Sequence, residues 1–329
     1  MTSSAVNTYP NDRFLNKTFV ATEINKYMQG NLIAESESVN RNIGNNKSVE
    51  WIEEKFSDAG DELRFTDLNK VELEQASIFE HVKFSQFEVK SAMLKTYGIE
   101  IDFSEECMEN QVAGLDWIQR GYQRAAYFLA KLINDLVFNS MTESWYSAGA
   151  ATEADDHPWN MAVTNPWSDT TNRDIIGDTQ AITLMIGDTE NYDYDVDRSY
   201  VRRDNYSEMT NYLQTKTNVP WARDPVTNQW NGMLEGVKFN KVHKLSGIPA
   251  STGLFMSRGV KPTKVFERTN PRYAAQVIAD NAGNTLPSSY HVHRYFSDSD
   301  HVTHIQIWRE IYPVTDRWGR KSIGILRAL

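Results

Sequence analysis

Residues Ser104 to Thr142 read SEECMENQVAGLDWIQRGYQRAAYFLAKLINDLVFNSMT and carry the longest uninterrupted helical pattern in the chain. Apolar or small residues recur there at steps of three and four, which places them on one face of a helix. Ser104 is a suitable N-cap, and Glu105 and Glu106 place negative charge near the positive end of the helix dipole. These features predict one helix of roughly 50 Å.

The length of this helix is the feature that needs explaining. A coiled coil requires a strict heptad, which Gly114 and Gly121 interrupt, and no second helix of similar length is present to build a bundle. We therefore expect a long brace lying across a mixed α/β protein. The two glycines lie seven residues apart, nearly on one helix face, and each costs about 1 kcal/mol relative to alanine. Two readings stay open: close approach of another backbone, or simple tolerance.

Composition excludes several classes of protein. The chain has 329 residues and a net charge of −10, from 34 basic and 44 acidic residues, so a cationic nucleic-acid-binding surface is disfavoured. Cys107 is the only cysteine, which excludes an intrachain disulfide framework and a cysteine-rich zinc site. The first residues lack the pattern of a signal peptide, and no apolar run reaches 18 residues. We expect no signal peptide and no membrane span.

Periodicity predicts the remaining elements. Helical spacing indicates helices, and alternation of apolar and polar residues indicates strands. The expected helices are Asn16 to Met28, a short one near Leu68 to Phe79, Ile175 to Ile186, and Asn205 to Lys216. The expected strands are Tyr97 to Phe103, Ser199 to Asp204, Val237 to His243, a hairpin turning at Ser297 to Asp300, and a last strand in RKSIGILRAL.

Four of the seven histidines lie between His291 and His304. If the hairpin turns at Ser297 to Asp300, Phe296 pairs with His301, and His293 lies opposite His304. His291 then lies two residues along on the same face, and three imidazoles on one sheet face suit zinc. The alternative, which we favour, is a solvated face with cross-strand polar pairs.

The acidic residues Asp193, Asp195 and Asp197 resemble the first ligands of a calcium-binding loop. An EF-hand then needs glycine and a late glutamate, where this chain has Arg198 and Asp204. We favour a solvated acidic turn. Cys107 has no histidine near it in sequence, so we expect a packed side chain rather than a nucleophile.

No motif indicates an enzyme. The sequence has no G-x-S-x-G elbow, no phosphate-binding loop of the form G-x-x-x-x-G-K-[ST], and no G-x-G-x-x-G fingerprint. Paired carboxylates are plentiful, but no spacing specifies a site. We therefore assign no catalytic, cofactor-binding or metal-binding residue, and expect no enzymatic activity and no cofactor.

Four stretches carry a resemblance to a known family. FEVKSAMLKTYGIEIDFSEE leads directly into the long helix, which continues as RGYQRAAYFLAKLINDLVFNSM. SYVRRDNYSEMTNYLQ is a strand running into a helix, and GMLEGVKFNKVHKLSGIP is a following strand. In this order of elements the chain resembles the major capsid protein of tailed double-stranded-DNA viruses, which infect bacteria or archaea.

The resemblance implies an α+β fold with five parts. These are an N-terminal arm (residues 1–47), an extended β-loop (48–103), the spine helix with the peripheral domain (104–172), a mixed α/β axial domain (173–287), and C-terminal strands that return to the peripheral domain (288–329). Both the arm and the extended loop would lie over neighbouring subunits. Their shortage of apolar residues for burial within one chain agrees with this.

The resemblance also implies function and partners. Copies of the chain would self-assemble as hexamers and pentamers into an icosahedral virion shell, built in the host cytoplasm around double-stranded DNA without sequence-specific binding. Separate scaffolding, portal and decoration proteins would be its partners. Some family members cross-link subunits through a loop lysine, and Lys90 and Lys95 are candidates by location alone. The alternatives are an encapsulin-like nanocompartment shell and a metal-dependent enzyme using the His291 to His304 hairpin.

Overall fold

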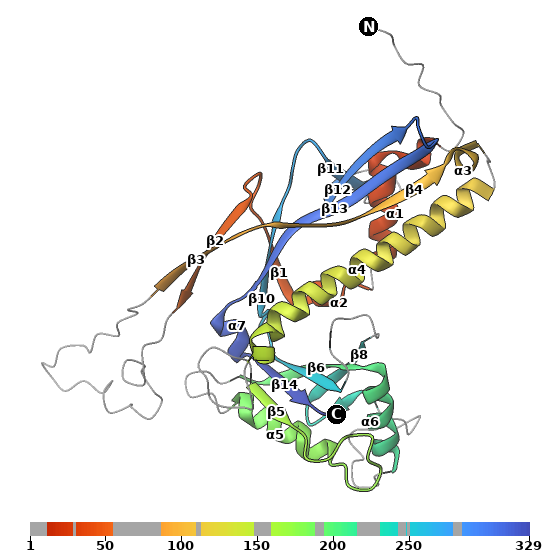
Figure 1. Cartoon of the computed structure of the whole chain (residues 1–329). Helices are drawn as coiled ribbons and strands as arrows, with labels where there is room; N and C mark the ends of the chain where they lie inside the picture. The colour runs from red at the N-terminus through yellow and green to blue at the C-terminus, as the bar shows by residue number, and fades with distance from the viewer. Residues whose placement is uncertain are drawn as a thin grey trace, which may run out of the picture. The chain divides into compact units, whose positions relative to one another are not determined.

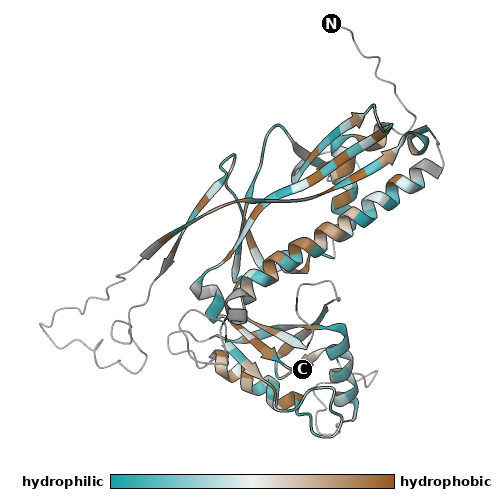
Figure 2. Cartoon of the chain, viewed as in Figure 1, coloured by the Kyte–Doolittle hydropathy of each residue, from teal (hydrophilic) through white to brown (hydrophobic). Residues whose placement is uncertain are grey.

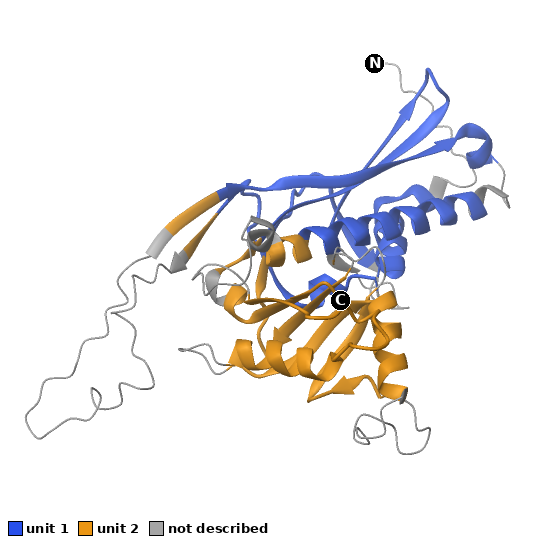
Figure 3. Cartoon of the chain, turned by 60° about the horizontal axis from the view of Figure 1, so that its bottom comes forward, with its two compact units in different colours: residues 1–49, 92–136, 265–313 blue, residues 50–91, 137–264, 314–329 orange. Residues whose placement is uncertain are grey.

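The computed structural model describes residues 12–28, 31–54, 87–109, 113–147, 159–187, 194–215, 231–242, 248, 251–278 and 285–329. The chain divides into two compact units (Figure 3). Unit 1 comprises residues 1–49, 92–136 and 265–313, and unit 2 comprises residues 50–91, 137–264 and 314–329. Each unit combines helices with a six-stranded sheet, so the α+β class expected from the sequence is confirmed.

The stretch from Ser104 to Thr142 contains two helices, α3 (Glu105–Glu109) and α4 (Ala113–Ser147, 35 residues). Residues 110–112 between them lie outside the described residues, and α4 ends five residues later than expected, at Ser147 rather than Thr142. Ser104 caps as predicted, since its Oγ accepts the backbone N–H of Cys107 at 3.4 Å. Figure 2 shows brown apolar positions recurring along α4.

Unit 1 is built on a sheet in the order β1-β10-β13-β12-β11, with β4 also pairing with β13 (Figure 1). Its strands are β1 (Ser38–Asn42), β4 (Lys95–Ser104), β10 (Thr263–Arg268), β11 (Ala274–Ile278), β12 (Thr285–Ser297) and β13 (Val302–Thr315). Its shorter helical segments are η1 (Asp12–Leu15), α1 (Lys17–Met28) and α2 (Ile33–Ser36). The strand predicted from Tyr97 to Phe103 is therefore a member of this sheet.

The core of unit 1 lies where α1 and α4 meet this sheet. Tyr122 of α4 is fully buried, its hydroxyl donates to the backbone oxygen of Phe14 at 2.7 Å, and its ring packs edge-on against Phe103 of β4. Helix α1 packs on β11 and β12, burying Val20 and Ile24 among others. The apolar face of the N-terminal helix is thus covered within its own chain.

Unit 2 contains a second sheet, in the order β5-β14-β9-β6-β8-β7. Its strands are β5 (Trp159–Ala162), β6 (Val196–Arg202), β7 (Met233–Leu234), β8 (Val237–Val242), β9 (Thr252–Ser257) and β14 (Ile323–Arg327), and its helices include α5 (Ile175–Gly187), α6 (Arg203–Thr215) and α7 (Arg317–Lys321). Helix α5 packs closely on β14 at Gly324, where an added Cβ would lie only 2.5 Å from Cδ1 of Ile186. The helices and strands predicted in this region agree with the structure within three residues at each end.

Strands β2 (Ser48–Glu54) and β3 (Phe87–Met93) form a separate two-stranded sheet, which we call the β2–β3 ribbon. The helix predicted near Leu68 to Phe79 falls in the interval between them and lies outside the described residues. Within the parts of the chain that are described, no helix is both long and apolar enough to cross a membrane.

Candidate functional site

The two faces of β4 have different environments, because successive side chains of a strand point to opposite faces. Phe103 and Ile101 face α4, and a Cβ added at Gly121 would lie 3.0 Å from the Phe103 ring and 3.4 Å from Cγ2 of Ile101. Of the two readings left open for Gly121, close approach is therefore the better one, although the approaching atoms belong to side chains and not to a backbone. The surroundings of Gly114 are not among the described features.

A groove of about 720 Å³ lies between β4 and α4. Trp117, whose side chain is 59% exposed, lines it together with Arg120 and Arg124. Cys107 also lines the groove, and burial raises the pKa of its thiol. A raised pKa disfavours the thiolate. Cys107 is only partly buried, so its role as a packed side chain stays a prediction.

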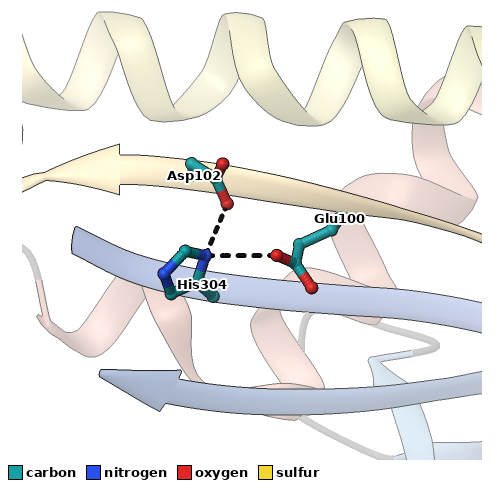
Figure 4. Close-up of side chains that lie close together, drawn as sticks. All are labelled: Glu100, Asp102 and His304. Atoms are coloured by element: carbon teal, nitrogen blue, oxygen red, sulfur yellow. Dashed lines mark hydrogen bonds and ion pairs between the residues drawn. The ribbon is translucent and has the colours of Figure 1, made fainter. Parts of the chain in front are cut away.

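The opposite face of β4 carries the most concentrated group of ligand-type side chains in the described part of the chain. Glu100 and Asp102 of β4 meet His304 of β13 there, and one ligand atom from each lies within 4.8 Å of the other two (Figure 4). The His304 Nδ1 atom is 2.7 Å from Oδ1 of Asp102 and 3.2 Å from Oε1 of Glu100. We call these three residues the β4–β13 cluster.

Neighbouring side chains hold this cluster in place. The Gln306 amide donates to Oε2 of Glu100 at 2.6 Å, and the Tyr295 hydroxyl donates to Oε1 of the same carboxylate at 3.2 Å. The bond from Gln306 is the main cause of the lowered pKa of Glu100. The Tyr295 ring stacks on the His304 ring with centroids 4.6 Å apart. Both the carboxylate and the imidazole are therefore oriented from outside the cluster.

The three-histidine arrangement considered from the sequence does not form. The hairpin closes with Ser297 opposite Val302, so His304 pairs with Tyr295 and not with His293. The turn is displaced by one residue because His301, with φ of 51°, takes the left-handed conformation that ends it. The prediction that Phe296 pairs with His301 is wrong for the same reason.

His291 is separated from the other two histidines by its own contacts. It pairs with Trp308 across the sheet, stacks on that indole, and accepts the backbone N–H of Asn270 at Nε2 over 2.8 Å. Its side chain is buried, and burial is the main cause of its lowered pKa. The ring is therefore a neutral structural group. The zinc hypothesis based on His291, His293 and His304, and the enzyme built on it, lose their geometric basis.

The acidic turn also differs from a calcium loop. Oδ1 of Asp197 is 2.7 Å from the guanidinium of Arg198, and Oδ2 of Asp195 lies 4.0 Å from that of Arg258. Asp193 lies outside the described residues. Asp197 lies on β6 and both described carboxylates face arginines, which does not favour a calcium loop. The solvated acidic turn stays a prediction.

The β4–β13 cluster was missed by sequence reasoning. The alternation that places Glu100 and Asp102 on one face of a strand is visible in the sequence, and His304 was already a candidate. The sequence does not show that β4 pairs with β13. This pairing places Asp102 opposite His304, although the two residues are 202 positions apart in the chain.

Comparison with known proteins identifies the fold. Neither a protein-family model nor a curated protein sequence matches the chain. Solved structures do match: the capsid of a native GTA particle has a TM-score of 0.57 at 12% identity, with 90% of each chain covered. A virus-like particle from Pyrococcus furiosus has a TM-score of 0.54 at 9% identity, covering 93% of this chain and 98% of that one.

A phage-related protein from Bordetella bronchiseptica RB50 matches with a TM-score of 0.52 at 11% identity, covering 94% of this chain and 95% of that one. At such low identity these likenesses establish the fold and nothing finer. The chain has the fold of phage and virus capsid proteins, and the fold inferred from the resemblance is confirmed.

Proposed function

We propose that this chain is a major capsid protein of a tailed double-stranded-DNA virus, and that its activity is self-assembly into a closed shell. The fold supports this proposal, since the structures that match over most of both chains include a GTA capsid and a virus-like particle. In this proposal hexamers and pentamers form an icosahedral virion shell in the host cytoplasm and enclose packaged DNA. Portal, scaffolding and decoration proteins would be further partners.

The observation that carries the proposal is the β2–β3 ribbon. An isolated two-stranded sheet is marginally stable in water, and this one exposes large apolar side chains. Ile52 of β2 is 61% exposed, and Val89 and Met93 of β3 are 65% and 69% exposed. Residues of this kind are normally buried, and an apolar two-stranded edge invites pairing with another chain. A neighbouring copy that covers the ribbon accounts for both features.

Helix α4 offers a second surface of the same kind. Trp117, Tyr127 and Phe128 of α4 are 59%, 43% and 48% exposed. Exposed aromatic residues are enriched in protein interfaces, where they bury a large area at low entropic cost. We propose that these residues also meet neighbouring copies. The five-part division of the chain and the cross-linking role of Lys90 or Lys95 stay predictions within this proposal.

The ribbon can be tested without disturbing the fold, because Ile52 and Val89 are exposed in the single chain. We expect Val89→Lys and Ile52→Lys to keep the circular dichroism and thermal midpoint of the parent protein but to form no shells, since assembly would bury an unpaired charge. Val89→Thr is the matched control. It keeps the branched shape and strand propensity, and it should assemble.

Electron microscopy and sedimentation velocity report the outcome. Closed particles or capsomer rings from the parent chain, with only small species from the two lysine variants, support the proposal. A parent chain that stays a monomer when co-expressed with its genomic neighbours would refute the capsid function. Normal shells from both lysine variants would instead refute the role of the ribbon alone.

The second candidate is an encapsulin-like nanocompartment shell. The match to a virus-like particle from Pyrococcus furiosus favours keeping it, because that assembly shares this fold. The contents of the particles distinguish the two. Nuclease-protected double-stranded DNA supports the virion, and a packaged cargo protein without DNA supports the nanocompartment.

A further inference from the structure

We infer that Glu100, Asp102 and His304 form a binding site for one divalent transition-metal ion, for which Zn²⁺ is the ion that suits the donors. The site links β4 to β13 on the face of the sheet opposite α4. It is independent of the proposed assembly, and it uses a different residue set from the three histidines considered from the sequence.

The geometry of the three donors suits a small cation. Zinc binds imidazole nitrogen and carboxylate oxygen at about 2.0–2.2 Å, so neighbouring ligand atoms in a tetrahedral site lie roughly 3.3–3.6 Å apart. The distance from His304 Nδ1 to Glu100 Oε1 is already 3.2 Å, and that to Asp102 Oδ1 is 2.7 Å. Widening the second distance by about 0.6–0.9 Å, to the tetrahedral range, needs only a rotation of Asp102, whose side chain is 60% exposed.

The imidazole distinguishes this cluster from a solvated acidic patch. Carboxylates alone suit magnesium and calcium, whereas a nitrogen donor beside them selects ions such as zinc. The His304 side chain is only 15% exposed and is held against the Tyr295 ring, so its Nδ1 is fixed toward both carboxylates. The two carboxylates are open enough for an ion to enter and for water to complete its coordination.

The supporting contacts around Glu100 match the usual construction of metal sites. Ligating carboxylates are generally hydrogen-bonded from behind, and loss of such a partner weakens metal binding 10- to 100-fold. Gln306 and Tyr295 both donate to Glu100 from outside the ligand set. Strands β4 and β13 thus contribute the ligands, and β12 and β13 contribute the supporting groups around them.

A simpler arrangement can produce the same contacts without any metal. A protonated His304 would bridge the two carboxylates as an ion pair, with the proton in the place of the ion. The two arrangements differ in stoichiometry and in their response to added metal. The nearby pair of His301 and Glu105, whose atoms are 3.2 Å apart, contains one imidazole and one carboxylate and serves as an internal control.

Isothermal titration of the full-length chain with Zn²⁺, supported by elemental analysis, tests the inference. We expect one ion per chain in the parent protein and in His301→Asn. Asp102→Asn and His304→Asn should each weaken binding at least 100-fold, and Gln306→Ala should weaken it 10- to 100-fold. Zinc at a hundredfold excess over the dissociation constant of the parent should raise the thermal midpoint by about 5 °C in the parent and in His301→Asn, but not in Asp102→Asn or His304→Asn.

The variants also separate loss of binding from loss of folding. Asp102 is largely exposed, so Asp102→Asn should keep the metal-free thermal midpoint of the parent chain. Stoichiometric binding that survives in both His304→Asn and Asp102→Asn would place the ion elsewhere and overturn the inference. The absence of zinc binding by the parent chain would reduce the cluster to a hydrogen-bonded ion pair only.

Discussion

Arg309 of β13 is the residue whose removal we expect to damage unit 1 most. The Arg309 side chain is 2% exposed, and its guanidinium donates to two carboxylates. One terminal nitrogen bonds Glu35 of α2, and the other bonds Glu267 of β10 at 2.8 Å. The guanidinium also lies 5.3 Å from the centre of the Tyr290 ring of β12. Burial lowers the pKa of Arg309, but the carboxylates outweigh burial and the net pKa is raised. One side chain thus joins four elements.

The perturbation is Arg309→Met, which keeps an apolar stem against Tyr290 and removes the charge. Two charge-assisted hydrogen bonds contribute about 1.5–3 kcal/mol each, and breaking a buried ion pair costs about 3–5 kcal/mol. Glu35 and Glu267 are 18% and 14% exposed, so water can partly solvate the carboxylates that are left behind. We therefore expect the lower end, a loss of about 3 kcal/mol in the free energy of unfolding.

Urea unfolding and hydrogen exchange of β13 amides measure this loss. With a urea dependence of about 3 kcal/mol per molar, the midpoint should fall by roughly 1 M. Arg309→Lys keeps the positive charge but loses the planar guanidinium that bonds both carboxylates, so its urea midpoint should lie between those of the parent and Arg309→Met. Adding Glu35→Gln and Glu267→Gln to Arg309→Met should restore part of the stability, because no unpaired charge then remains. A loss below 1 kcal/mol in the single variant would refute the reasoning.

Two further predictions concern the same unit. Asn134 of α4 is buried and accepts a hydrogen bond from the backbone N–H of Ala34 at 3.0 Å. Asn134→Leu should lower the free energy of unfolding, measured in urea, by about 2 kcal/mol, because that N–H then loses its partner. Asn139 is exposed, so the control Asn139→Leu should change the same quantity by less than about 0.5 kcal/mol. His291 accepts the N–H of Asn270 only when neutral, and its pKa lies below the ordinary 6.5, so its stabilising contribution is present above about pH 6.5 and is lost as pH falls through the lowered pKa. Urea midpoints measured between pH 8 and 5 should fall on acidification, and a rise would contradict this assignment.

Several elements of this protein, but not the short strands such as β5, β9, β10 and β11, could be predicted from local patterns. Helical spacing predicted α1, α5 and α6 within one or two residues, because burial of one helix face leaves a periodicity that any single segment displays. The apolar alternation from Tyr97 to Phe103 predicted β4 in the same way. The exceptional length of α4 was also visible from the local pattern, and it led to the family resemblance that the fold confirms.

The candidate site could not be predicted, because its residues come together only through pairing between distant strands. The turn that sets the register of β12 and β13 was misplaced by one residue, since nothing local indicated that His301 would take the left-handed conformation. That displacement separated His304 from His293. The pairing of β4 with β13 then placed Asp102 opposite His304.

The long stretch from Ser104 to Thr142 shows both sides of this division. The sequence alone determined that its described parts, α3 and α4, are helical, that one face of α4 is buried and that Ser104 caps α3. These properties depend on neighbours within a few residues. Tertiary structure alone decided why Gly121 is there, since the Phe103 ring packs against it. It also decided that the opposite face of β4 carries a cluster of potential metal ligands. Contacts between distant segments depend on strand pairing and packing, which no local pattern specifies.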